Sequence, residues 1–182
     1  DYIDTNEFNK HNSLYGKDGL LRLMNYNETK ILSTNTNNES SRKVQYSYKQ
    51  STLTDYGKIF DHTIIGEYSH KLKNISDNID GAEGIILIYS QYIEGGLIPT
   101  ALMLEEMGFK RHDGENLLKT KATKKLSHSY VIISGDKRFS PNNDTVVSEC
   151  SQVNNKDGSK IKVILISNIC VNIMFKFIKI RI

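Results

Sequence analysis

The sequence contains few cysteines and none in a metal-binding pattern. Its 182 residues include two, Cys150 and Cys170, with no CxxC spacing and no histidine nearby. Structural zinc sites and disulfide frameworks need cysteines, or cysteines and histidines, at short regular spacings. We therefore expect two ordinary thiols, and we exclude a cysteine-based metal site and a disulfide-rich fold.

Long hydrophobic runs are also missing. No apolar stretch reaches the roughly 20 residues that a membrane-spanning helix needs, and the chain begins at Asp1 without a signal-peptide pattern. The 24 Lys and Arg residues against 21 Asp and Glu give a formal charge of +3, which permits a polyanionic partner without requiring one. These features favour an intracellular fragment with no membrane partner.

Catalytic motifs are scarce. Ser90 stands between Tyr89 and Gln91 rather than in G-x-S-x-G, which argues against a hydrolase nucleophile. No G-x-G-x-x-G follows a predicted strand, which argues against a Rossmann-type enzyme. We interpret Glu105 and Glu106 as solvated residues near the end of a helix. Four histidines show no metal-ligand spacing and are expected to be exposed: His62, His70, His112 and His128.

Residues 1–67 are polar and poorly periodic. A tract of Ser, Thr and Asn near 33–42 has nothing to bury and predicts a disordered loop. The stretch before this tract predicts a turn and a short helix that carries Leu20, Leu23 and Met24 on one face. We expect an irregular, partly helical lead-in.

Residues 68–182 are more regular. A helix is predicted first, from the apolar spacing of Tyr68, Leu72, Ile75 and Ile79. Three continuous apolar runs of strand length follow, at residues 84–90, 130–134 and 161–167. Such runs are typical of parallel strands that are buried on both faces.

Two helices separate these predicted strands. The first carries Pro99 near its first turn and stops at Gly108. The second starts at Ser140 and Pro141, a good N-cap followed by a residue suited to the first helical position. A basic, loop-like stretch at 110–127 lies before the second strand.

The predicted order β-α-β-α-β gives an α/β fold, a parallel sheet with flanking helices. The carboxyl ends of parallel strands share one edge, and ligands of open parallel sheets bind outside that edge. Ser90, Ser134 and Ser167 each stand where a strand gives way to a loop. Three such serines in succession predict a shared binding edge.

Several segments have a more specific amino-acid sequence. They are IYSQYIEGGLIP at 88–99, ALMLEEMGF at 101–109, YVIISGD at 130–136 with SPNN at 140–143, and KVILIS at 162–167. Together with YGKDGL at 15–20 and YGKIF at 56–60, they resemble the C-terminal RecA-like domain of superfamily II helicases. The likeness is to the SNF2-like helicases and transcription-associated NTPases of large DNA viruses. Residues 88–99 resemble helicase motif IV, and 162–167 resemble the strand entering motif V.

The resemblance implies one lobe of a helicase driven by ATP and Mg²⁺, in which two RecA-like lobes grip a DNA or RNA backbone. The implied partners are the nucleic acid, the missing N-terminal lobe of the same protein and the viral transcription machinery. The implied location is the virion, the host cytoplasm or a virus factory.

The motif correspondence also implies site residues. Phosphate contacts are expected from Ser90, Gln91, Ser134 and Gly135, because hydroxyls, amides and backbone N–H groups bind phosphate without reading bases. Ser167 belongs to the same edge. Basic side chains would add counterion-releasing contacts: Lys137 and Arg138, with Lys110 and Arg111 as further candidates.

The chain also departs from the family. It contains no GxxxxGK[ST], so no loop can cradle ATP phosphates, and the acidic Mg²⁺-binding motif and the final arginine motif are absent. We expect no cofactor in this fragment, no catalytic residue and no hydrolysis by it alone. Residues 168–182 lack the glycines of motif V. We interpret them as a truncated or frame-disrupted tail, the alternative being a diverged strand.

A second functional class stays open beside the motor lobe. It is a stand-alone RecA-like module that binds nucleic acid or protein without motor activity. A phosphate-cradling loop encoded immediately upstream would favour the motor, and an in-frame start near Asp1 without such a loop would favour the module.

Overall fold

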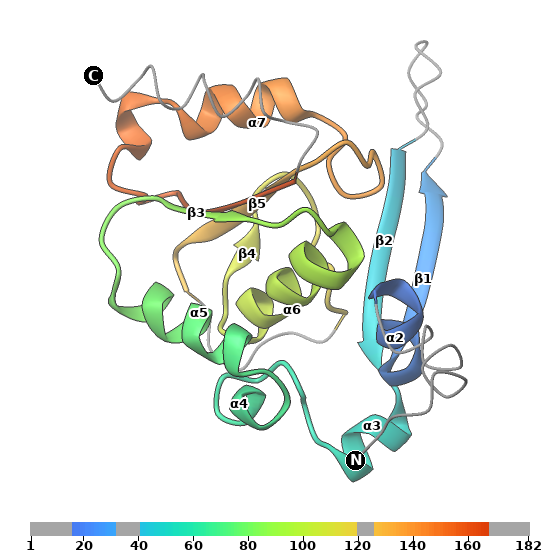
Figure 1. Ribbon diagram of the computed structural model, residues 1–182. Helices are drawn as coiled ribbons and strands as arrows, with labels where there is room; N and C mark the ends of the chain where they lie inside the picture. Colours follow the sequence, from blue (N-terminus) through green and yellow to red (C-terminus); the bar gives the residue numbers. More distant parts are fainter. Residues whose placement is uncertain (1–15, 32–40, 120–125, 168–182) are drawn as a thin grey trace.

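The central sheet has four strands and is parallel throughout (Figure 1). This computed structural model describes residues 16–31, 41–119 and 126–167. The strand order is β3-β6-β5-β4. The strands are β3 (Ile86–Tyr89), β4 (Lys110–Arg111), β5 (Ser129–Ile133) and β6 (Ile161–Ile166). The predicted α/β class, a parallel sheet with flanking helices, is confirmed.

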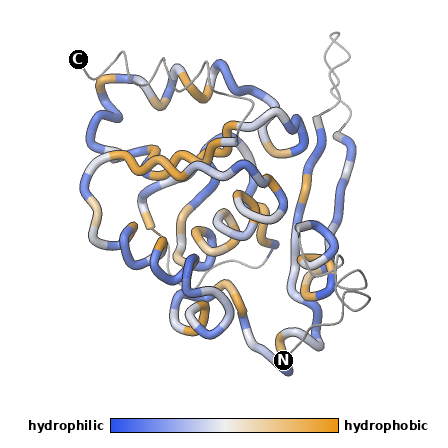
Figure 2. The backbone as a smooth tube through the Cα atoms, viewed as in Figure 1, coloured by the Kyte–Doolittle hydropathy of each residue, from blue (hydrophilic) through white to orange (hydrophobic). Residues whose placement is uncertain are grey.

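Helices cover both faces of this sheet. On one face lie α5 (His70–Gly81) and α6 (Ile98–Glu106), and on the other lies α7 (Asn143–Cys150). Hydrophobic residues concentrate on the central strands, as Figure 2 shows in orange. The two layers of helices therefore bury a sheet that is apolar on both sides.

The strand β5 shows how its sequence serves both layers. Tyr130 and Ile132 join the core on the α6 side, whereas Val131 and Ile133 join the core on the α7 side. This alternation is the two-residue repeat of a strand. Every residue of β5 is buried, and after Ser129 its residues 130–133 are the apolar run expected of a strand covered on both faces.

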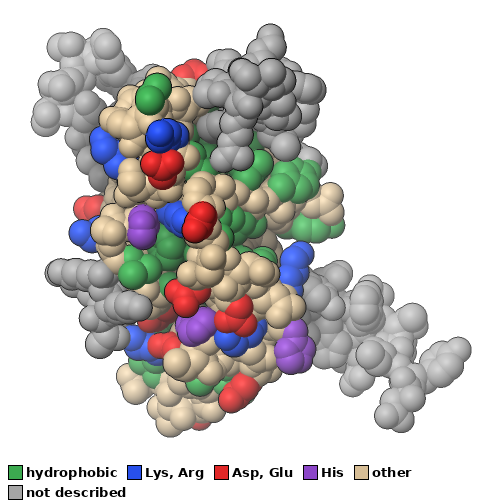
Figure 3. Space-filling model, turned by 90° about the vertical axis from the view of Figure 1, so that its left-hand side faces the viewer, with side chains coloured by type: hydrophobic (Ala, Val, Ile, Leu, Met, Phe, Trp, Pro, Cys, Tyr) green, Lys and Arg blue, Asp and Glu red, His purple; other side chains and the backbone are tan. Residues whose placement is uncertain are grey.

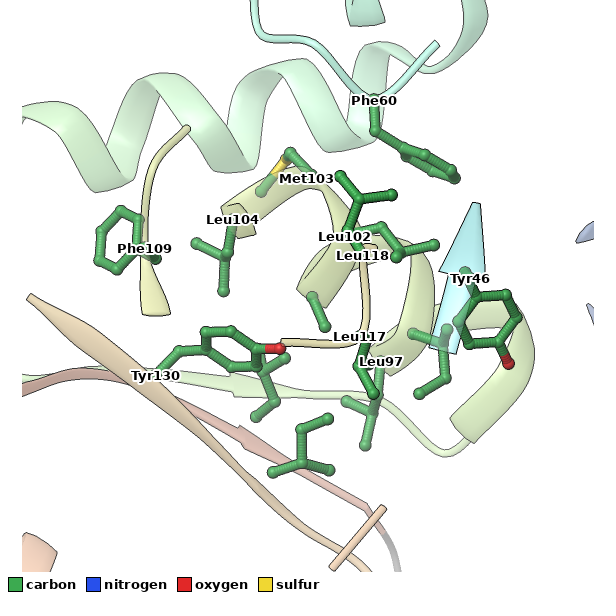
Figure 4. Packing of buried hydrophobic residues seen from close by; sticks show 14 of the residues in the cluster. Tyr46, Phe60, Leu97, Leu102, Met103, Leu104, Phe109, Leu117, Leu118 and Tyr130 are labelled. Carbon is green, nitrogen blue, oxygen red and sulfur yellow. The ribbon is translucent and has the colours of Figure 1, made fainter. Parts of the chain in front are cut away.

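The helix α6 is the centre of the larger core. Figure 4 shows its side chains packed among residues of other elements, including Phe109 and Tyr130. A π-helical turn, η2 (Ile93–Leu97), leads into α6, and Pro99 lies in its first turn as predicted. Five α6 residues have no exposed surface: Ile98, Ala101, Leu102, Met103 and Leu104.

The lead-in contains a hairpin that the sequence analysis did not predict. After α2 (Gly16–Leu23), the strands β1 (Met24–Ile31) and β2 (Ser41–Tyr48) pair antiparallel. Met24 was expected in the helix, but it is the first residue of β1. It is fully buried. The predicted disordered loop at 33–42 falls largely outside the described residues, and its last two residues belong to β2.

Short elements connect the hairpin to the sheet. They are α3 (Gln50–Asp55) and α4 (Ile65–Tyr68), and a 3-10 turn, η3 (Val153–Asn155), precedes β6. Tyr68 was predicted to share a helical stripe with Leu72, but it ends α4 and is exposed. Ser69 separates the two helices because its hydroxyl accepts a hydrogen bond from Leu72 N, 3.2 Å away, and caps α5.

The prediction that the first strand is buried on both faces is wrong. β3 is the edge strand and pairs only with β6. Leu87 and Tyr89 are 45% and 51% exposed, whereas α7 packs against β5, which lies two strands away in the sheet. The apolar sequence of β3 reflects one covered face, where Ile86 and Ile88 pack against the larger core.

The basic stretch at 110–127 is not merely a loop. Its first two residues form β4, a fourth strand, and Leu117 and Leu118 are buried in the larger core. The main chain there extends the hairpin: Tyr46 N donates to Leu117 O at 2.6 Å, and Lys119 N donates to Tyr46 O at 2.8 Å. The stretch therefore joins β2 to the core of the sheet.

The carboxylate of Glu105 holds this junction together. Its Oε1 accepts hydrogen bonds from Leu117 N at 2.8 Å and from the Tyr130 hydroxyl at 2.5 Å, and its Oε2 accepts one from Leu118 N at 2.5 Å. The residue is 1% exposed. The prediction that Glu105 is solvated is therefore wrong, because its carboxylate has found three donors inside the protein.

Burial raises the pKa of Glu105 to about 7, against the three hydrogen bonds and the Arg111 charge, which lower it. A carboxyl group with a raised pKa binds more protons in the folded than in the unfolded state between its two pKa values. Its contribution to stability is therefore fully present below about pH 4.5 and is lost as the pH rises to about 7.

Replacing Glu105 with glutamine should remove this pH dependence. We expect the difference in unfolding free energy between the wild type and Glu105→Gln to fall by on the order of 2–3 kcal/mol from about pH 5 to about pH 8. Urea denaturation at a series of pH values measures it. The exposed Glu83→Gln is the control, and a wild-type advantage that grows with pH would contradict the assignment.

Candidate nucleic-acid interface

The carboxyl ends of three strands lie side by side at one edge of the sheet. Tyr89 and Ile133 both pair with Ile166, the last residue of β6. The chain leaves these strands in register, since Ser90 N donates to Ile166 O at 3.0 Å and Ser167 N donates to Ile133 O at 3.1 Å. The structure thus brings the three predicted serines to a shared edge.

Ser90 shapes the turn that leaves β3. Its hydroxyl accepts a hydrogen bond from Tyr92 N at 3.1 Å and donates one to Tyr92 O at 3.0 Å. Gly96 lies against this hydroxyl so closely that a β-carbon there would meet Ser90 Oγ at 2.1 Å. The turn and η2 are therefore fitted to each other.

Ser134 shapes the corresponding turn after β5. It has no exposed surface. Its hydroxyl accepts from Asp136 N at 3.2 Å, its backbone N–H donates to Ser140 Oγ at 3.1 Å, and its carbonyl accepts from Asn143 Nδ2 at 2.7 Å. In this conformation the hydroxyl is inaccessible to a phosphate, so we assign Ser134 to the turn rather than to ligand contact.

Ser140 is not the N-cap that the sequence predicts. That position belongs to Asn142, and α7 starts at Asn143. Ser140 is buried and its hydroxyl donates to Ile132 O at 2.8 Å, which ties the loop back to β5. The same hydroxyl also contacts the Asn143 side chain, so Ser140 links the end of β5 to the first residue of α7.

The remaining predicted contacts differ in exposure. Ser167 is buried, and its hydroxyl has no hydrogen-bond partner among the described residues. Gln91, Gly135 and Lys137 are exposed, and the Lys137 ammonium donates to Pro141 O at 3.2 Å. Among the predicted contacts at this edge, these three therefore offer exposed polar groups.

Arg138 is engaged by two carboxylates. Its Nη2 lies 2.6 Å from Asp136 Oδ2 and 3.1 Å from Glu94 Oε1. Although partial burial acts to raise it, these hydrogen bonds hold the pKa of Asp136 below its usual value. Asp136 also accepts a hydrogen bond from Arg138 N at 3.0 Å, so its carboxylate caps a backbone N–H group of this turn. The cluster carries one positive and two negative charges.

Lys110 and Arg111 lie away from this edge. Lys110 pairs with Ser129, the first residue of β5, and so belongs to the amino end of the sheet. The Arg111 side chain is buried, with Nε 2.9 Å from Asp113 Oδ1 and Nη2 2.6 Å from Phe139 O. Neither residue joins the candidate site.

The hairpin adds groups that the sequence analysis missed. It stands beside the carboxyl edge of the sheet (Figure 1), where Tyr26 donates to Glu28 at 2.7 Å. Partial burial and Glu28 raise the pKa of Tyr26, whereas nearby Arg138 acts to lower it. Alternate residues of β2 are buried, namely Val44, Tyr46 and Tyr48. That two-residue repeat was the available signal for the strand.

On the opposite side of the sheet, the basic side chains of the described residues do not gather in one patch (Figure 3). Figure 3 views the side on which the chain enters β3 and β6, and basic, acidic and histidine side chains are interspersed there. Across the described residues, no three of His, Cys, Asp and Glu are grouped to hold a metal ion. The sequence also contains no GxxxxGK[ST] loop.

Comparison with known proteins adds no relative. No protein family, curated protein or solved structure matches this chain. Within the described ranges, every helix is too short or too polar to cross a bilayer. Function is therefore argued from the residues of the carboxyl edge themselves.

Gly96→Ala should destabilise the protein by about 1–3 kcal/mol, because the new methyl group would overlap Ser90. Gly95→Ala is the matched control, since a β-carbon there meets nothing closer than 3.6 Å. Ser90→Gly removes both overlapping atoms and should reduce the cost of Gly96→Ala. Denaturation of the wild type, Ser90→Gly, Gly96→Ala and the double variant measures this coupling. Additive effects of the two substitutions would contradict the contact.

Proposed function

We propose that this chain is the nucleic-acid-gripping lobe of an ATP-dependent superfamily II helicase or translocase, of the SNF2-like type of large DNA viruses. The observation that carries the proposal is the shared edge formed by the carboxyl ends of β3, β6 and β5. Ligands of open parallel sheets bind outside such an edge. The resemblance of residues 88–99 to helicase motif IV supports it, since Gln91 lies there.

The proposed contacts are Gln91, Gly135 and Lys137. They offer an amide, a backbone N–H group and an ammonium, all exposed, and these groups bind phosphate oxygens without reading base identity. Ser90 and Ser134 hold the turns that carry Gln91 and Gly135. A motor that moves along any sequence needs contacts of this kind, on DNA or RNA.

The charges of the edge predict weak binding by this lobe alone. Arg138 is neutralised by Asp136 and Glu94, which leaves Lys137 as the main cation of the proposed contact set. Few counterions would be released, so the affinity should depend only shallowly on salt. Tight binding and ATP hydrolysis would need the second lobe that the resemblance implies, with ATP and Mg²⁺ held largely by that lobe.

The alternative, a stand-alone binding module, uses the same edge without a motor. The two functions differ in what joining the second lobe does. For the motor lobe, fusion to an N-terminal lobe bearing GxxxxGK[ST] should create nucleic-acid-stimulated ATP hydrolysis. For the module, such a fusion should leave hydrolysis unstimulated.

Lys137→Ala should weaken binding of the chain to a single-stranded oligonucleotide and make it less dependent on salt. Loss of one phosphate contact lowers the slope of log affinity against log salt by about 0.7. Fluorescence anisotropy at several salt concentrations measures this slope. Gln91→Ala should weaken binding without changing the slope, because the amide carries no charge.

Lys156→Ala is the matched control, because Lys156 is equally exposed but follows η3 at the amino side of β6. If Lys156→Ala weakens binding as much as Lys137→Ala, binding is diffuse and the proposed interface is wrong. If the wild-type chain binds no strand at any salt concentration, the proposed function itself fails.

A further inference from the structure

A hollow of about 370 Å³ lies beside the proposed backbone contacts. The turn after β3 and η2 form one side of it, with Gln91, Tyr92, Glu94 and Gly95, and the turn after β5 contributes Asp136 and Arg138. A hollow of this volume is at the lower end of those that hold small organic ligands. Of the phosphate contacts proposed above, Gln91 lines this hollow, whereas Gly135 and Lys137 are not among its lining residues.

The charges in this hollow disfavour a phosphate. Arg138 is shared by Asp136 and Glu94, so these three side chains carry a net negative charge. Glu94 accepts its hydrogen bond from Arg138 through Oε1 only, and its Oε2 has no donor among the described residues. The hollow therefore offers an acceptor to a neutral ligand that bears N–H groups.

Tyr92 supplies an aromatic surface on a fixed backbone. Tyr92 is 64% exposed, more than Tyr56, Tyr68 or Tyr89. Its backbone N–H donates to Ser90 Oγ at 3.1 Å, and its carbonyl accepts from Leu97 N at 3.1 Å. The backbone position of Tyr92 is thus fixed, and its exposed ring offers a flat ligand a face to stack on.

We propose that this hollow is a subsite for one nucleobase of the bound strand, a base with an exocyclic amino group. The base stacks on Tyr92 and its amino group donates to Glu94, as cytosine N4 does to carboxylates elsewhere. The inference rests on the proposed function and deepens it, because the phosphates on either side of this base would lie along Gln91 and Lys137.

Tyr92→Ala should weaken binding of an oligo-dC strand by about tenfold, since stacking of one base on an aromatic side chain contributes about 1–3 kcal/mol. Tyr92→Phe should retain the wild-type affinity. An abasic strand of the same length should bind the wild type and Tyr92→Ala equally. Oligo-dC should bind better than oligo-dT, and Glu94→Gln should reduce that preference. Anisotropy titrations of the full chain measure all of these affinities.

Tyr68→Ala, which removes an exposed tyrosine from α4, is the control and should leave affinity unchanged. Thermal melting checks that each variant is folded. Equal oligo-dC affinity for Tyr92→Ala and wild type would overturn the subsite while leaving the proposed function standing, and absence of any strand binding would overturn both. Micromolar binding of free cytidine would show a nucleoside site and overturn the assignment to a strand.

Discussion

The fold depends most on the buried carboxylate of Glu105. It lies on α6, the helix at the centre of the larger core, and accepts hydrogen bonds from two backbone N–H groups, of Leu117 and Leu118, and from the Tyr130 hydroxyl. Those donors belong to the stretch that pairs with the hairpin and to β5. One side chain thus links the helix layer, the sheet and the lead-in. A buried carboxylate is tolerated only where such donors replace water. The backbone N–H groups of Leu117 and Leu118 must therefore stay within hydrogen-bonding distance of Glu105.

This arrangement places the hairpin beside the carboxyl edge of the sheet and so defines the candidate interface. The edge itself is built from turns whose serines face inward. Ser90 and Ser134 satisfy backbone groups of the turns that follow them, which exposes the next residues, Gln91 and Gly135. The polar surface offered to a ligand is therefore an amide and a backbone group with one lysine, beside a hollow of net negative charge. Such a surface suits phosphate contacts that do not read the bases, together with one stacked base whose amino group donates to Glu94.

The sequence predicted the parallel strands, since β5 and β6 are largely apolar. It also predicted the helix α6, since Pro99 and Gly108 mark its ends. It also located the three serines at one edge. It did not predict the hairpin, because β1 is mostly polar and the alternation in β2 alone does not identify a partner strand. The two-residue strand β4 was not predicted either. The burial of Glu105 depends on donors 12 and more residues away in the chain, and local composition carries no signal for them. The exposure of Leu87 follows from strand order, which an apolar run does not determine.

The proposed function places nucleic acid along the carboxyl edge of the sheet. Photo-crosslinking of the full chain to a single strand containing a photoreactive pyrimidine, followed by mass spectrometry of the crosslinked peptides, tests this most directly. The account predicts crosslinks within residues 89–96 and 134–138, with Tyr92 the principal site of attachment. Crosslinks concentrated in α5 or in residues 151–160, at the amino side, would contradict it.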